Sequence, residues 1–260
     1  MFSSDLTTNS VPHAVGVEVI IDTLDDRLVA EGNKIKNLYS GLPKLKTQVL
    51  YFGSRGVELK NKNQIKQNGQ RVNFLKIDRR LGSGNLSKKQ PLPKAIGPNL
   101  NIFDATAGFG GDAAILALIG FNVTAAEQSP IISTLLRDGI YRAMCDDSFK
   151  EQVKKRLLFI EGDSIKLLNQ QHGVDVVYLD PMFPPKKKKH ALPPGHIQTL
   201  KEIIGYDNQQ KTLELFHHAM HIAKSRVVVK RPRNTEVVYK NPVAIHKCKT
   251  VRYEVYKPIN

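Results

Sequence analysis

The string Asp180-Pro181-Met182-Phe183-Pro184 contains residues that could activate an amine. An exocyclic amine is a poor nucleophile because its lone pair is delocalised into the neighbouring ring or carbonyl. The carboxylate of Asp180 and the main-chain carbonyl of Pro181 are both acceptors, so they could bind the two N–H hydrogens and localise that lone pair. Phe183 could stack on a nucleic-acid base, a contact worth about 1–3 kcal/mol. We therefore expect these three residues to be catalytic, the alternative being a proline-stiffened turn.

A second group of residues indicates a site for a small ligand. It consists of a loop with three glycines and an aspartate on each side: Gly108, Gly110, Gly111, Asp104 and Asp112. Glycines let a main chain turn tightly and approach a ligand closely. The loop also fits a dinucleotide fingerprint, which leaves a nicotinamide cofactor open. The two carboxylates would repel a pyrophosphate and attract an ammonium group, which favours S-adenosylmethionine, a methyl donor.

Further polar side chains follow the next two apolar runs along the chain. Glu127 could accept hydrogen bonds from both ribose hydroxyls of a nucleoside cofactor. Asp163 and Ser164 could contact the adenine edge, and the alternative for this pair is a helix cap.

Positive charge is concentrated in two segments of this chain, whose formal net charge is +15. Residues 34–94 hold fifteen Lys and Arg against two acids, and residues 186–233 hold eleven against three. Such segments favour a polyanionic partner over a merely solvated surface. The expected phosphate contacts are Lys186, Lys187, Lys188, Lys189, Lys230 and Arg231.

The elements that must position these residues follow an alternating pattern from Leu100 onward. Short apolar runs alternate with helical periodicity, which is typical of a parallel sheet with crossover helices. The expected strands are Asn101–Asp104, Asn122–Ala126, Leu157–Ile160, Asp175–Leu179 and Arg226–Val229. The expected helices are Asp112–Ile119, Pro130–Met144 and Asn208–Ala223, and Ala244–Tyr256 alternates like a late β-hairpin.

The N-terminal part has a different pattern. The alternating stretches VEVII, QVLYF and RVNFLKI predict a small α+β lobe at residues 1–95, before a larger domain at residues 96–260. The segment Gly82–Asn99 has the composition of a flexible linker, although a basic glycine-rich loop could equally touch the substrate.

Composition excludes several other classes of protein. With 41% apolar residues among 260, the chain can form a core of ordinary size, which excludes overall disorder. Its apolar runs are too short to cross a bilayer, and no signal peptide is recognisable, so we expect a cytoplasmic protein. The two cysteines, Cys145 and Cys248, lie far apart, and no His cluster has metal-ligand spacing, so we expect no metal site.

Three strings together resemble a known family. DATAGFGGDAAILALIGFNVTAAEQSP, VVYLDPMFP and RVVVKRP are similar to the bacterial ribosomal small-subunit RNA methyltransferases of the RsmJ type, over about Tyr51 to Tyr256. The resemblance implies a class I, Rossmann-like, S-adenosylmethionine-dependent fold. It also implies methylation of the N2 amine of one guanine, at position 1516 of 16S RNA, in free RNA or the small ribosomal subunit.

The resemblance also assigns cofactor contacts to individual positions. These are Gly111, Asp112, Glu127, Gln128, Asp163, Ser164 and Asp180. Gly111 and Gln128 stand where the family usually has arginines. Two further hypotheses remain open: amino-group methylation of DNA adenine or protein glutamine, and a non-catalytic RNA-binding assembly factor.

Overall fold

The computed structural model describes residues 16–79, 86–181, 209–236, 239 and 241–259. The chain divides into two compact units, Met1–Gln70 and Arg71–Asn260. This division lies earlier in the chain than the boundary at 95/96 expected from composition. The reason is that residues 71–79 and 86–95 pack within the second unit.

The first unit is a three-stranded sheet with one helix. Its elements are β1 (Gly16–Ile21), α1 (Asp26–Leu38), β2 (Lys44–Gly53), β3 (Gly56–Asn61) and the short 3-10 helix η1 (Lys62–Gln64). β2 is the central strand, parallel to β1 and antiparallel to β3. A Cβ on Gly32 of α1 would lie 2.8 Å from Ile21, so glycine lets this helix pack closely on the sheet. The unit is the expected α+β lobe.

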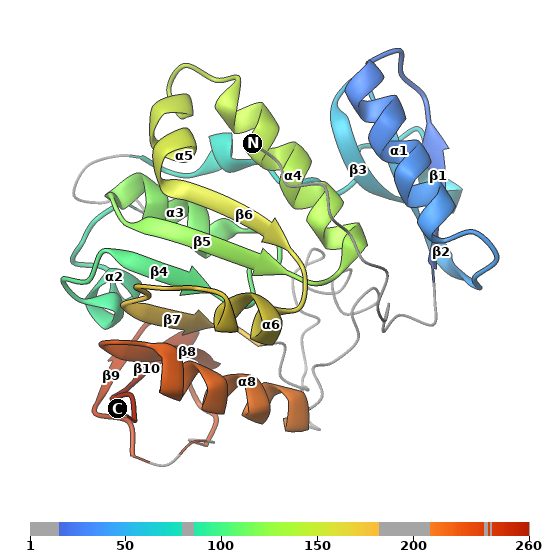
Figure 1. Cartoon of the computed structure of the whole chain (residues 1–260). Coiled ribbons are helices and arrows are strands. Elements are labelled where there is room, and N and C mark those ends of the chain that lie inside the picture. Colours follow the sequence, from blue (N-terminus) through green and yellow to red (C-terminus); the bar gives the residue numbers. More distant parts are fainter. Residues whose placement is uncertain (1–15, 80–85, 182–208, 237–238, 240, 260) are drawn as a thin grey trace. The chain divides into compact units, whose positions relative to one another are not determined.

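The second unit contains a seven-stranded sheet in the order β6-β5-β4-β7-β8-β10-β9 (Figure 1). Its strands are β4 (Asn101–Asp104), β5 (Asn122–Glu127), β6 (Leu157–Glu161), β7 (Val176–Leu179), β8 (Arg226–Pro232), β9 (Ala244–Lys247) and β10 (Val251–Tyr256). The first five are parallel, and β10 runs antiparallel to both β8 and β9. All five predicted strands and the hairpin are confirmed, but β8 continues three residues beyond its predicted end.

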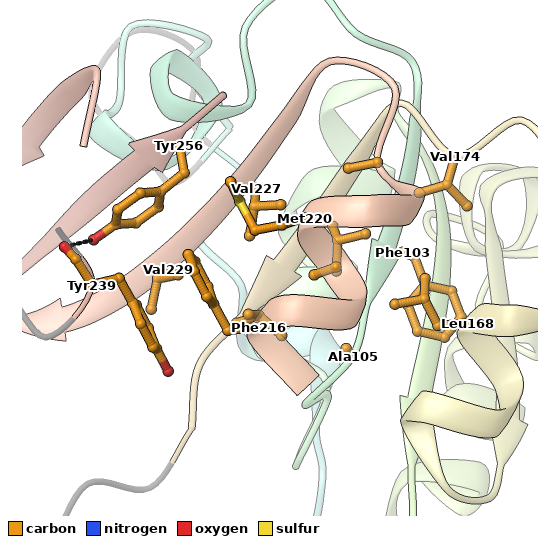
Figure 2. Close-up of a cluster of buried hydrophobic side chains, with 14 of the residues drawn as sticks. Phe103, Ala105, Leu168, Val174, Phe216, Met220, Val227, Val229, Tyr239 and Tyr256 are labelled. Atoms are coloured by element: carbon orange, nitrogen blue, oxygen red, sulfur yellow. Dashed lines mark hydrogen bonds between the residues drawn. The ribbon is translucent and has the colours of Figure 1, made fainter. Parts of the chain in front are cut away.

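Helices cover both faces of this sheet. They are α2 (Pro91–Ile96), α3 (Gly111–Ile119), α4 (Pro130–Met144), α5 (Lys150–Arg156), α6 (Ser164–Asn169) and α8 (Gln209–Ile222). Figure 2 shows α8 packed on one face, where Phe216 stacks on Tyr239 with ring centroids 3.7 Å apart. Tyr178 lies between Val177 and Leu179 of that apolar face, so its side chain points to the opposite face, where it contacts α3.

The stretch RVNFLKI, Arg71–Ile77, is not the strand that its alternation suggested. It contains a 3-10 helix, η2 (Phe74–Lys76), and packs on α4. A Cβ on Gly139 would lie 2.3 Å from Val72, which shows how closely this segment meets α4. Alternation failed here because the buried residues Val72 and Phe74 face a helix rather than a neighbouring strand.

The expected linker is also only partly correct. Residues 80–85 lie outside the described residues, but residues 91–96 form α2, whose Leu92, Ala95 and Ile96 are buried. The Arg226 guanidinium donates a hydrogen bond to the Ala95 carbonyl at 3.0 Å. This half of the segment is therefore part of the core and not a flexible connection.

Candidate active site

The glycine loop lies between β4 and α3, at the carboxyl end of the sheet. Gly108 and Gly110 have φ angles of 55° and 70°, in the left-handed region that favours glycine. A Cβ on Gly110 would also lie 2.6 Å from Leu136 of α4, whereas a Cβ on Gly111 would meet nothing within 4 Å. The main chain at Gly111 is therefore open to a ligand.

Glu127, the last residue of β5, holds this loop in place. Its carboxylate accepts one hydrogen bond from the Gly108 amide at 2.9 Å and another from the Ser129 amide at 2.8 Å. The side chain is only 7% exposed. Because an ionised carboxylate has about four acceptor positions, Glu127 can brace the loop and still bind ribose hydroxyls.

Asp104, at the end of β4, is buried beneath the same loop. Its carboxylate accepts a hydrogen bond from the Thr106 amide at 3.1 Å. Burial raises the pKa of Asp104 well above its ordinary value, and the nearby carboxylates of Asp112 and Asp180 act in the same direction. This carboxyl group therefore resists ionisation unless a positive group lies beside it.

Asp163 and Ser164 make contacts within the protein. Asp163 caps α6, because its side chain accepts a hydrogen bond from the Lys166 amide at 3.0 Å. The Ser164 hydroxyl donates to the Ala105 carbonyl at 2.5 Å and so ties α6 to the residue after β4. These are the contacts of the helix-cap alternative. Gln128, by contrast, is exposed.

Asp180 follows β7 and lies on the same face of the sheet as Tyr178 and Asp104. Its amide donates to the Thr106 hydroxyl at 2.6 Å, and its side chain is 39% exposed. Pro181 is buried beside it. Asp180 and the glycine loop therefore come together through Thr106. Phe183 and the run Lys186–Lys189 lie outside the described residues.

Lys230 contacts two carboxylates, although the sequence predicted a phosphate contact. Its ammonium lies 2.8 Å from Asp112 Oδ2 and 2.9 Å from Asp180 Oδ2. The Tyr178 hydroxyl also donates to Asp112 Oδ2, at 2.6 Å. Burial lowers the pKa of Lys230, but Asp180 and Asp112 outweigh burial and raise that pKa above its ordinary value. Lys230 therefore remains a cation inside the site.

Arg231, the other basic residue predicted to contact RNA at the end of β8, is 5% exposed. It points to the opposite face of the sheet from Lys230, as neighbouring residues of a strand do. There its guanidinium donates to the Glu236 carbonyl at 3.4 Å. A buried guanidinium is not placed for contact with an RNA backbone, which disagrees with the prediction.

Three residues that sequence reasoning missed complete the site. Thr106 anchors the Asp180 main chain, Tyr178 binds Asp112, and Tyr253 lies opposite Lys230 in the pairing of β8 with β10. Burial raises the pKa of Tyr253, and Asp112 acts in the same direction. The sequence carried one signal for Tyr178, since it is the only polar side chain in the buried run VVYL.

The residues present fit S-adenosylmethionine. The carboxylates of Asp112 and Asp180 offer negative charge to a ligand bearing an ammonium and a sulfonium, and Glu127 offers acceptors to its ribose. The open main chain at Gly111 lies within this group. Among the described residues, no group of three His, Cys, Asp or Glu side chains could hold a metal ion. None of the described helices has the length and apolar character needed to span a membrane.

Comparisons with known proteins identify the family and the fold. Residues 37–258 match the SAM_MT family model, whose description is SAM-dependent methyltransferase. A solved SAM-dependent methyltransferase from Neisseria gonorrhoeae superposes with a TM-score of 0.68 and 28% identity, covering 93% of this chain and 96% of that one.

Three curated relatives to which the chain is similar carry the name ribosomal RNA small subunit methyltransferase J. The relative from Buchnera aphidicola is 35% identical over 82% of this chain and 87% of its own length. The relative from Haemophilus influenzae is 32% identical over 93% of this chain and 96% of its own length. A third, from Hydrogenovibrio crunogenus, is 40% identical over 68% of this chain, and the match spans 64% of its length. The fold, the carboxylate-lined glycine loop and these matches together place the chain in the ribosomal RNA small subunit methyltransferase J family, whose cofactor is S-adenosylmethionine.

Proposed function

We propose that this protein methylates the exocyclic N2 amine of a guanine in 16S ribosomal RNA, with the guanine at position 1516 as its target. The observation that carries the proposal is the position of Asp180. It is a half-exposed carboxylate at the carboxyl end of β7, joined through Thr106 to the loop that can hold the cofactor. An acceptor in this position can bind an amine beside a methyl donor.

In this proposal the protein contributes acceptors and alignment. The bound cofactor supplies an electrophilic methyl group on its sulfonium. Asp180 and the Pro181 carbonyl accept the two amine hydrogens, so the nitrogen lone pair points at the methyl carbon. The N–C bond forms as the S–C bond breaks, and the proton that the nitrogen loses is held at the Asp180 carboxylate. Phe183 stacks on the guanine ring.

Contact with RNA is proposed for the run Lys186–Lys189, which adjoins Asp180 in the sequence. Four adjacent cations suit a phosphate backbone, and in the sequence they follow closely on the residues proposed to bind the amine. Lys230 and Arg231 are not included, because the one is held by carboxylates and the other is buried.

A labelling experiment tests this function. The protein is incubated with labelled S-adenosylmethionine and with 16S RNA or small subunits from cells that lack the enzyme, and the modified nucleoside is mapped by mass spectrometry. We expect N2-methylguanine at a single position. We also expect Asp180→Ala to abolish turnover and Phe183→Ala to reduce it. Equal rates in the wild type and both variants would overturn the assigned roles.

The same experiment separates the other candidate functions. Label in DNA adenine or in protein glutamine would replace the guanine assignment with another amine. Binding of RNA without binding of S-adenosylhomocysteine, measured by calorimetry, would favour a non-catalytic assembly factor. A calorimetric signal for S-adenosylhomocysteine that is lost in Glu127→Ala would exclude that alternative, because an inactive fold has no need of a selective cofactor pocket.

A further inference from the structure

The ammonium of Lys230 joins two carboxylates from distant parts of the chain. Asp112 stands in the first turn of α3, Asp180 follows β7, and Lys230 itself belongs to β8. Both contacts are charge-assisted hydrogen bonds, at 2.8 Å and 2.9 Å. The Lys230 side chain is only 21% exposed, so the ion pair is partly shielded from solvent. A cation in this position acts inside the site.

The bond to Lys230 has a direct consequence for Asp180. This residue lies after the end of its strand and has a half-exposed side chain, so β7 alone does not fix the direction of its carboxylate. Two of its contacts restrain that direction: the Thr106 hydroxyl accepts from its amide, and Lys230 donates to Oδ2. The carboxylate is therefore oriented before any amine arrives.

We propose that Lys230 is a positioning residue for methyl transfer, clamping Asp180 to Asp112 and so aligning the amine-binding carboxylate with the helix that begins at the glycine loop. This proposal rests on the proposed function, since it assumes that Asp180 receives the amine. Lys230 itself touches neither the amine nor the methyl group. Its role is to set the distance between Asp180, which receives the amine, and Asp112 at the start of α3.

The charges around the clamp explain why a cation is needed there. Asp104, Asp112 and Asp180 converge on Lys230 from β4, α3 and β7. The other titratable groups near it are the phenols of Tyr178 from β7 and Tyr253 from β10, and the thiol of Cys248 in the turn before β10. Without Lys230, the carboxylates of Asp112 and Asp180 would repel each other across a partly buried site. They would then separate or take up a proton, and either change removes the acceptor from the amine.

The experiment compares Lys230→Met with Lys224→Met. Lys224 is an exposed lysine two residues before the amino end of β8, so its variant removes the same charge far from the site. Guanine methylation is followed with labelled cofactor over a range of RNA concentrations and pH values. We expect Lys230→Met to lower kcat by about 100-fold, as misplacement of a reacting group does, with a KM for RNA within about threefold of wild type. We expect wild-type values for Lys224→Met.

The pH profile distinguishes positioning from a merely structural role. In Lys230→Met, the acidic limb of the kcat profile should move to higher pH, because Asp180 has lost its adjacent cation. Lys230→Arg keeps a cation, so its acidic limb should stay at the wild-type pH while part of kcat returns. Thermal denaturation and calorimetry with S-adenosylhomocysteine confirm that each variant is folded. If Lys230→Met does not fold, Lys230→Gln, which is one atom shorter but keeps a hydrogen-bond donor without the charge, should show the same loss and the same shift.

Two results would overturn the proposal. One is wild-type kcat in a folded variant that has no charge at position 230. The other is a variant whose only change is a raised KM for RNA, which would return Lys230 to the role of a phosphate contact. Failure of the wild type to methylate guanine would instead overturn the proposed function, and the two failures are separated by the wild-type control in the same assay.

Discussion

At the scale of single residues, two carboxylates of the candidate site also hold the fold of the glycine loop. Glu127 braces the glycine loop through the Gly108 amide, and Asp104 is buried under that loop with the Thr106 amide as its partner. These residues were predicted from the sequence because carboxylates after parallel strands meet at one edge of a sheet. Their hydrogen-bond partners could not be predicted from the sequence. These partners are main-chain amides, which almost every residue carries, so residue type does not show which amide will donate.

Replacement of Glu127 by Gln should weaken cofactor binding more than it weakens folding. The amide nitrogen of Gln cannot accept a hydrogen bond, so either the Gly108 or the Ser129 amide loses its acceptor. We expect the Kd for S-adenosylhomocysteine to rise by roughly 10- to 100-fold, the equivalent of about 1–3 kcal/mol. Calorimetry measures this, with the exposed Glu151→Gln as control. An unchanged Kd would show that Glu127 does not contribute to cofactor binding.

Asp104→Asn should change how stability depends on pH. Burial raises the pKa of Asp104 in the folded state above the ordinary value of 3.8, so the folded protein holds a proton that the unfolded chain releases. The stabilisation is full below that ordinary value and is lost as pH rises toward the folded pKa. We expect the free energy of unfolding of the wild type to fall relative to that of Asp104→Asn over the pH range that begins at 3.8 and ends at the raised folded-state pKa. Parallel urea midpoints for the two proteins across this range would contradict the assignment.

At the scale of elements, the sequence predicted the regular parts and missed the irregular ones. The five parallel strands and α4 have strong apolar patterns, and all were confirmed. The contacts around Lys230 could not be predicted, because they depend on β8 continuing past Val229 and pairing with β10. RVNFLKI was misread because period-two alternation does not distinguish a strand from an extended segment on a helix.

The packing of the segment Arg71–Ile77 on α4 can be tested by adding one methyl group to Gly139. A Cβ on Gly139 would lie 2.3 Å and 2.6 Å from two atoms of the Val72 side chain. Gly139→Ala should therefore destabilise the protein by about 1–3 kcal/mol in urea unfolding. Gly111→Ala is the matched control, because a Cβ there meets nothing within 4 Å, and its unfolding midpoint should stay near wild type. Equal midpoints for both variants would mean that the segment is not closely packed.

The strand β10 carries a buried ion pair whose loss should be costly. Glu254 is fully buried, accepts hydrogen bonds from Arg252 at 2.8 Å and 2.5 Å, and accepts another from the Tyr256 hydroxyl at 2.7 Å. Glu254→Ala would leave buried guanidinium charge without its carboxylate. We expect a loss of about 3–5 kcal/mol of stability. For Glu151→Ala, at an exposed pair, the unfolding midpoint should stay near that of the wild type. Thermal and urea unfolding measure both variants. Similar losses of stability would show that the buried pair contributes no more to stability than the exposed pair.

At the scale of the whole molecule, the excess of positive charge should determine how RNA affinity depends on salt concentration. A formal charge of +15 implies association that weakens steeply with salt. Replacing all four residues of Lys186–Lys189 by Gln should lower RNA affinity and reduce the slope of log affinity against log salt by roughly 3 to 4. Filter binding across a salt series measures that slope, with a variant of four exposed lysines of the first unit as control. Identical slopes for the Lys186–Lys189 variant and wild type would place the RNA contact elsewhere.

The position of β10 also affects the order in which the molecule can be completed during translation. β10 lies between β8 and β9 and brings Tyr253 beside Lys230, yet it follows both of them in the sequence. While a ribosome is still synthesising the protein, β8 can pair with β7 but has no partner on its other side. A nascent chain therefore exposes an unpaired strand edge at β8 until β10 has emerged from the ribosome.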